Sequence, residues 1–227
     1  SFFSSIQTLT SDASDTAARE EVVGAAQTLT SQFTQLGSYL DDMASDVNSQ
    51  ISDQVTQVND LTEQIAGLNK KISLSDALGS TSNALLDQRD LLVSQLSELV
   101  DVDVTTQSNG SYTVALSNGL ALVSGNDSFD LQTAVSASDP TQTVVTYVDA
   151  AGHTTVLDDS TFEGGSLGGL MDFRDTSLSD AQNQLGILAV SLTQAFNTLQ
   201  AAGVDLNGDS GSAFFSVDDP SIYGNTQ

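Results

Sequence analysis

Apolar residues recur at helical spacing over residues 18–72, in steps of three or four positions that average about 3.6. This average favours a nearly straight α-helix over a strongly supercoiled one. The pattern predicts one long amphipathic helix over residues 16–72, with Ser14 or Asp15 able to cap its start. A kink or break is expected at residues 37–38, where a glycine precedes a serine.

Two further helical stripes follow along the chain. A leucine stripe that begins at Leu85 predicts a second helix over residues 82–100. Only a short loop separates it from the first helix, so the two are expected to run antiparallel. A third stripe extends over residues 167–199, and Gly203 is placed to end that helix as a C-cap.

Between the second and third helices, apolar and polar residues alternate. The alternation surrounds Asn109-Gly110 and Asn118-Gly119, and Asn-Gly is the strongest short signal for a β-hairpin. A further strand, turn and strand are predicted by the segment TVVTYVDAAGHTTVL. Residues 101–162 are therefore predicted to form a small antiparallel β-unit.

The order of the elements predicts an α+β fold. We expect an elongated bundle of long antiparallel helices, with a small antiparallel β-domain inserted between helices two and three. Residues 1–100 would be the first part of a helical core domain and residues 101–162 the inserted β-domain. Residues 163–227 would be the second part of the core, ending in a loop towards a missing segment.

The composition of the chain excludes several classes of function and of binding site. The chain has 5 Lys and Arg against 30 Asp and Glu, for a formal net charge of −25. Such a charge repels phosphate groups and anionic lipids, so nucleic-acid and membrane-surface binding are excluded as functions. The absence of cysteine rules out disulfides and cysteine-ligated zinc.

The segment GVDLNGDSGSAFF resembles the start of a calcium loop, because Asp205, Asn207 and Asp209 alternate. An EF-hand loop also needs a glycine at its sixth position and a glutamate at its twelfth, and both positions hold serine. We therefore favour a turn tied by the side chains of Asp205 and Asn207, after which Phe214 and Phe215 return the chain to the bundle. A calcium-dependent secreted adhesin or binding module remains the alternative.

A second candidate site is the segment GGSLG, which matches the nucleophile elbow of serine hydrolases around Ser166. The single histidine, His153, precedes this serine, whereas the hydrolase fold needs its histidine after it. Ser166 is more simply the N-cap of the third helix. We therefore predict that the protein is not an enzyme and binds no cofactor or metal.

Two arginines lie within helical patterns. Arg89 occupies an apolar slot and is flanked by Asp87 and Asp90, which suggests a guanidinium shared with carboxylates of a neighbouring helix. Arg174, in the segment LMDFRD, suggests the same. A contact between subunits is the alternative for both. The residues predicted to have structural roles are Leu85, Asp87, Arg89, Asp90, Ser166, Gly168, Gly169, Arg174, Asp205, Asn207, Phe214 and Phe215.

Four segments occur in an order and with separations that resemble one family: LLDQRDLLVSQLSELVDVDV, GSYTVALSNGLALVSG, GGSLGGLMDFRD and NTLQAAGVDLNGDSGSAFF. The chain resembles the flagellar hook-associated protein 1 family of the hook–filament junction. It would be the core of such a protein without its two terminal helical segments. The family often has proline where this chain has Asp15-Thr16, which affects only the start of the first helix.

The resemblance implies a non-catalytic structural protein of the bacterial flagellum, active in motility. Such a protein is secreted by flagellar type III export without a cleaved signal peptide, and is extracellular. Its implied partners are copies of itself in a ring, the hook protein and the second hook–filament junction protein. A flagellar export chaperone would bind through a missing terminal segment.

Overall fold

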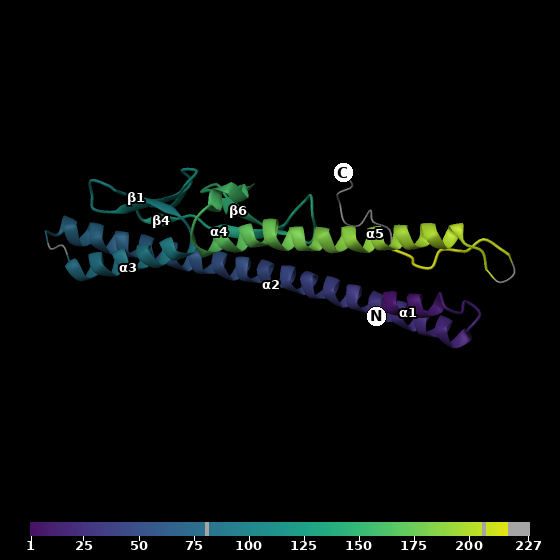
Figure 1. Cartoon of the computed structure of the whole chain (residues 1–227). Coiled ribbons are helices and arrows are strands. Elements are labelled where there is room, and N and C mark those ends of the chain that lie inside the picture. Colours follow the sequence, from purple (N-terminus) through teal and green to yellow (C-terminus); the bar gives the residue numbers. More distant parts are fainter. Residues whose placement is uncertain (80–81, 206–207, 218–227) are drawn as a thin grey trace. The chain divides into compact units, whose positions relative to one another are not determined.

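The computed structural model describes residues 1–79, 82–205 and 208–217 (Figure 1). The predicted α+β class, with an antiparallel β-region between the second and third long helical segments, is confirmed. The helical elements are α1 (Phe2–Leu9), α2 (Thr16–Ala77), α3 (Asn83–Leu99), the 3₁₀ turn η1 (Asp159–Phe162), α4 (Gly165–Asp172), the π-helical segment η2 (Phe173–Leu178) and α5 (Ser179–Ala202).

The chain divides into two compact units. The first consists of residues 1–42 together with the chain from residue 178 onwards, and the second of residues 43–177. The helix α2 contributes to both units. Within the described residues, no helix is both long and apolar enough to cross a membrane.

The start of α2 matches the sequence pattern. The Asp15 carboxylate accepts hydrogen bonds from the backbone N–H groups of Ala17 (2.8 Å) and Ala18 (3.4 Å), so Asp15 rather than Ser14 caps the helix. The break expected at residues 37–38 is wrong, because α2 continues without interruption through Gly37 and Ser38.

The third stripe forms three consecutive helical elements, α4, η2 and α5, rather than the single α-helix we expected. The π-helical turn of η2 carries Arg174, whose contacts are described below. Gly203 follows α5 as its C-cap with φ −84° and ψ 170°, so the helix ends there in an extended conformation.

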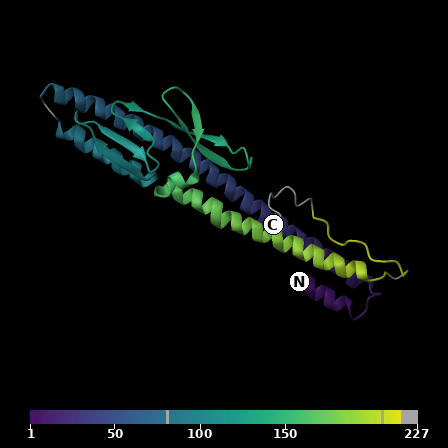
Figure 2. The ribbon, with the colours of Figure 1, turned by 90° about the horizontal axis from the view of Figure 1, so that it is seen from above.

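In the second unit, the strands form two antiparallel sheets (Figure 2). The first has the order β1-β2-β3-β4, and the second β5-β6-β7. Their bounds are β1 Val102–Thr106, β2 Tyr112–Leu116, β3 Ala121–Ser124, β4 Asp127–Ser128, β5 Leu131–Val135, β6 Thr143–Val148 and β7 Thr154–Val156. The two Asn-Gly turns connect β1 to β2 and β2 to β3, as predicted, and their glycines Gly110 and Gly119 have φ of 77° and 85°.

One apolar core joins the helices and both sheets of the second unit. Successive turns of α2 supply buried residues, and both sheets contribute apolar residues to the same core. Members of this core without exposed surface include Ile51, Val58, Ile65, Leu96, Val114, Leu122 and Val145.

Candidate functional site

Asparagine side chains of α2 hold the strands of the second unit by bonding to their backbones. The Asn59 amide donates to the Leu131 carbonyl (2.8 Å), and its oxygen accepts from the Leu131 N–H (2.9 Å). The Asn48 amide donates to the Thr141 carbonyl (2.8 Å) and accepts from the Thr143 N–H (3.3 Å). Each amide thus pairs with strand or loop backbone as a neighbouring strand would.

Asn69 is the most deeply placed of these asparagines, with no exposed surface. Its amide nitrogen donates to the carbonyls of Tyr112 (2.9 Å) and Gly125 (2.6 Å). Its oxygen accepts from the Tyr112 N–H (3.0 Å) and from Nη1 of Arg89 (3.1 Å). All the hydrogen-bonding capacity of this amide is therefore used in linking α2 to the first sheet and to α3.

The surroundings of Arg89 correct our expectation of a shared carboxylate. The guanidinium is buried, donates to the Gly110 carbonyl (2.7 Å) and stacks on the Tyr112 ring at 3.3 Å from its centroid. Among the described residues, no carboxylate lies within ion-pair distance of Arg89, and its Nε has no hydrogen-bond partner. Asp90 is exposed and accepts a hydrogen bond from the Tyr112 hydroxyl (3.0 Å) instead.

The other two residues of α3 that we predicted to have structural roles are not among the partners of Arg89 described above. Leu85 is half-buried and Asp87 is exposed. The Arg89 charge is therefore balanced by carbonyl dipoles and an aromatic face, which a planar, weakly hydrated guanidinium accommodates better than an ammonium group does.

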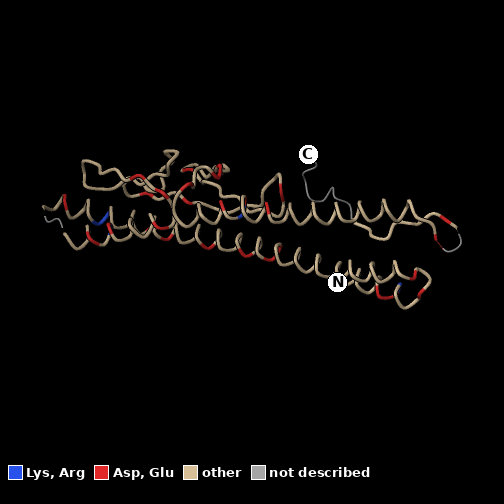
Figure 3. The backbone as a smooth tube through the Cα atoms, in the orientation of Figure 1, with Lys and Arg blue, Asp and Glu red and all other residues tan. Residues whose placement is uncertain are grey.

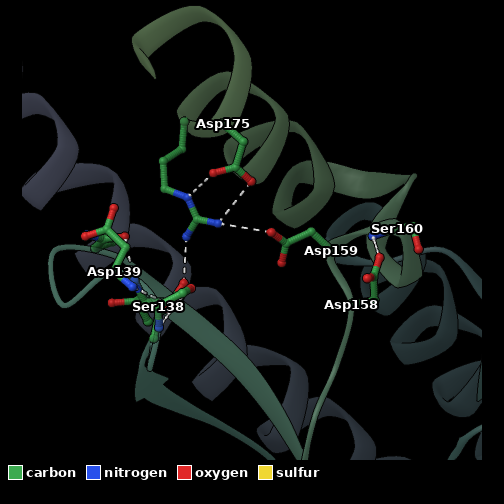
Figure 4. A network of polar contacts seen from close by, with 10 residues as sticks. Ser138, Asp139, Asp158, Asp159, Ser160 and Asp175 are labelled. Atoms are coloured by element: carbon green, nitrogen blue, oxygen red, sulfur yellow. Dashed lines mark hydrogen bonds and ion pairs between the residues drawn. The ribbon is translucent and has the colours of Figure 1, made fainter. Parts of the chain in front are cut away.

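Arg174 does form ion pairs within the chain, and Figure 4 shows its polar surroundings. Its Nε lies 2.7 Å from Asp175 Oδ1, and its Nη2 lies 3.1 Å from Asp175 Oδ2 and 3.3 Å from Asp159 Oδ2. Its Nη1 donates to the Thr143 carbonyl of β6 (2.6 Å). We call Arg174, Asp159 and Asp175 the Arg174 cluster. It links η2 to η1 and to β6.

The carboxyl groups in and near this cluster differ in the direction in which their pKa values are shifted. Burial, followed by the hydrogen bond and charge of Asp175, raises the pKa of Asp159 above its ordinary value. Hydrogen bonds from Ser160 lower the pKa of the adjacent Asp158. Hydrogen bonds from Thr141 likewise lower the pKa of Asp139, which lies in the loop between β5 and β6.

Ser166 does not cap the third helical segment, so that prediction is wrong. The N-cap is Gly164, and Ser166 lies in the first turn of α4, where its hydroxyl donates to Gln54 Oε1 (3.0 Å). His153 is exposed and its Nδ1 pairs with Asp149 Oδ2 at 3.0 Å. The structure therefore does not bring this serine and histidine into hydrogen-bond contact.

Two glycines beside Ser166 allow a close approach of backbone segments. A Cβ atom on Gly165, whose φ is 74°, would overlap the Leu99 carbonyl. A Cβ on Gly168 would overlap the Phe162 carbonyl, whereas a Cβ on Gly169 would meet no atom within 4 Å. Gly168 is thus required by packing and Gly169 is not.

In the loop after α5, Asp205 ties the turn as expected. Its Oδ1 accepts from the Asp209 N–H (2.9 Å), and its own N–H donates to the Asp209 carbonyl (2.8 Å). Asn207 lies outside the described residues. Within the part of the chain that is described, no group of three or more acidic or histidine side chains is placed to hold a metal ion, and nothing supports the calcium alternative.

Phe214 and Phe215 return to the first unit and join an aromatic cluster there. Phe196 lies 5.2 and 5.4 Å from their ring centroids, and Phe2 lies 5.7 Å from the ring of Phe215. The Asn197 oxygen accepts from both phenylalanine N–H groups (2.8 and 3.0 Å), and its amide donates to the Phe215 carbonyl (2.7 Å). Here too an asparagine amide binds backbone groups of a non-helical segment.

The helix α5 has an uncharged exposed surface on which apolar residues lie among polar ones. Residues 181–204 contain no charged residue, and Figure 3 shows α5 without acidic or basic positions beyond its first turn. None of its residues is buried, and Ile187, Leu188 and Leu199 are 66%, 57% and 74% exposed. A helix that is apolar on more than one face is normally covered on more than one side, so α5 is the strongest candidate for a contact surface.

Comparisons with known proteins agree on one family. Residues 1–215 match the family model described as "Flagellar hook-associated protein FlgK helical domain". Flagellar hook-associated protein 1 of Escherichia coli strain K12 is 41% identical over the whole chain, and that of Salmonella typhimurium is 42% identical; the chain spans 42% and 41% of their lengths. The flagellar hook junction protein FlgK from Burkholderia pseudomallei matches with a TM-score of 0.90 and 44% identity, over 96% of this chain and 39% of that one. The chain belongs to the flagellar hook-associated protein FlgK family.

Proposed function

We propose that this chain is the core of a structural, non-catalytic subunit at the junction between the flagellar hook and filament. The observation that carries the proposal is the match over nearly the whole chain, in sequence and in fold, to a flagellar hook junction protein. The chain spans about two-fifths of the relatives it matches, so the properties of the whole protein belong to the proposal.

We infer further that the subunit assembles with copies of itself into a ring, between the hook protein and the second junction protein. It would be exported through the flagellar type III apparatus to an extracellular position, with an export chaperone bound to a segment outside this chain. The uncharged surface of α5 supports self-assembly. Copies of a chain with net charge −25 repel one another at most other surfaces.

A chimaera tests the junction role. This chain would replace the matching segment of the Salmonella relative, in a strain that lacks its own hook-associated protein 1. We expect the chimaera to restore filaments on hooks, and motility on soft agar. Hooks that stay without filaments, although the chimaera is exported, would contradict the proposed function.

The contact surface is tested in the same strain. Leu188→Glu combined with Leu199→Glu places two charges on the exposed face of α5, and should abolish filament retention without changing the helical content. The matched control is Asn183→Asp combined with Gln194→Glu, which adds the same charge at exposed polar positions roughly a third of a turn away from Leu188. If both double variants retain filaments equally, the face of α5 is not an assembly contact.

We also keep the predicted domain division, 1–100, 101–162 and 163–227, as a proposal. Limited proteolysis is the appropriate measurement, because domain boundaries are cleaved before compact regions. Early cleavage near residues 100 and 162 would support the division. Cleavage that begins inside the strands instead would refute it.

A further inference from the structure

The Arg174 cluster contains one cation and two carboxylates, so it carries a surplus negative charge at neutral pH. The guanidinium side chain is only 4% exposed, while the Asp159 and Asp175 side chains are 43% and 32% exposed. A carboxylate in such a partly desolvated position is costly when its charge is not fully balanced. Binding one proton at the cluster would therefore remove the unbalanced negative charge and its energetic cost.

The position of the cluster gives that proton a structural effect. Arg174 lies on the π-helical segment η2, a rare backbone form that is held by its surroundings. It contacts η1 through Asp159, which Figure 4 labels. It also donates to the Thr143 carbonyl of β6. Any change in the pairing of Arg174 therefore acts on three elements that come from separate parts of the second unit.

The remaining charged groups around the cluster do not supply a second cation. Asp158, next in the chain, adds a further negative charge that acts on Asp159. Hydrogen bonds from Thr141 are the main cause of the lowered pKa of Asp139, and the charge of Arg174 lowers it further by a smaller amount. The strands β6 and β7 carry no charged residue. Among the described residues, Arg174 is thus the one cation that acts on Asp159.

We propose that the Arg174 cluster is a proton-operated latch, in which Asp159 takes up one proton from solvent as the pH falls and then donates a hydrogen bond to Asp175. Asp175 keeps its negative charge and its paired hydrogen bonds with the guanidinium. The protonated cluster is neutral, with Arg174 balanced by Asp175 alone. The latch then fastens η2 to η1 more tightly than it does at neutral pH.

The raised pKa of Asp159 agrees with this geometry and fixes the sign of its effect. A group with a higher pKa in the folded state binds its proton more tightly there than in the unfolded chain. The stabilisation from Asp159 therefore grows as pH falls through its folded-state pKa, and is complete below its ordinary value of 3.8. The neighbouring Asp158, whose pKa is lowered, has the opposite sign.

Carboxyl ¹³C NMR of the chain, titrated from pH 7 to pH 3, tests the latch directly. We expect the Asp159 carboxyl to titrate above the ordinary value, and the backbone amides of Thr143 and of residues 173–178 to shift with the same midpoint. Asp175→Asn removes the negative charge of the proposed acceptor and leaves Asp159 as the one carboxylate paired with Arg174, so the midpoint of Asp159 should move down. An Asp159 midpoint at or below the ordinary value, or one unchanged by Asp175→Asn, would overturn the latch.

Urea unfolding adds a second readout that does not depend on assignments. Asp159→Asn mimics the neutral side chain at every pH, so the wild-type midpoint should rise relative to this variant as the solution is acidified. Asp158→Asn is the matched control beside it, and the wild-type midpoint should fall relative to that variant over the same range. A wild type that loses stability relative to both variants on acidification contradicts the proposal.

Discussion

Replacing Asn69 by alanine should destabilise the second unit more than any other single change of a polar side chain in α2. The substitution removes four hydrogen bonds, to the Tyr112 carbonyl and N–H, to the Gly125 carbonyl and from Arg89. At roughly 1 kcal/mol for each, their loss amounts to about 4 kcal/mol. Water that enters the gap can restore some of the bonds, which sets a lower bound of about 2 kcal/mol.

The assay is urea unfolding followed by circular dichroism, together with hydrogen exchange of the Tyr112 amide. Loss of its acceptor on Asn69 should make that amide exchange faster even under native conditions. Asn183→Ala is the control, since Asn183 is exposed on a helix, and a change within about 0.5 kcal/mol is expected there. A loss below about 2 kcal/mol for Asn69→Ala, with unchanged exchange at Tyr112, would refute the reasoning.

Asn69→Asp separates charge from hydrogen bonding at the same position. The carboxylate would give Arg89 the ion pair that the sequence suggested, but it cannot donate to the two carbonyls that the amide nitrogen binds. We expect a net loss of stability, because two partly buried carbonyls would then face a carboxylate oxygen instead of a donor.

Two further predictions concern packing and acid stability. Gly168→Ala should cost about 2 kcal/mol or more in urea unfolding, because its Cβ would overlap the Phe162 carbonyl. Gly169→Ala, with open space around it, should be neutral or stabilising by up to about 1 kcal/mol from helix propensity. Asp139 has a lowered pKa, so its contribution to stability is present above its ordinary pKa and is lost as pH falls through its folded-state value. Asp139→Asn should therefore lose less stability on acidification than the wild type does, and Thr141→Val should shift the Asp139 titration upward.

Periodicity was sufficient to predict the long helices and the hairpins. Burial on one face repeats along α2 with the period of the helix, and Asn-Gly permits the positive φ that the two turns adopt. The π-helical segment η2 left a weaker signal, which we overlooked. The apolar stripe steps by five residues from Phe173 to Leu178, across η2, whereas its other steps are three or four.

The residues that attach the sheets to α2 were missed for a different reason. In the sequence, nothing distinguishes Asn48, Asn59 and Asn69 from ordinary polar residues on the exposed face of a helix. Their separations of eleven and ten residues, close to three helical turns each, are the signal that could have placed them on one side of the helix. Arg89 was misjudged because a carboxylate nearby in the sequence suggested an ion pair, while its neutral partners come from Asn69 and from the Gly110 carbonyl, more distant in the chain.

Hydrogen bonds from asparagine side chains also protect an edge strand from pairing with a strand of another molecule. β5 is the edge of its sheet, and the N–H and carbonyl of Leu131 would be available to another strand if Asn59 did not bind both. One edge of a side-chain amide presents an N–H donor beside the carbonyl acceptor, as a peptide group does, so it completes the ladder without adding a strand. For the self-assembly proposed above, a closed edge has a consequence: association through the sheet is prevented, which leaves the proposed uncharged face of α5 as the route.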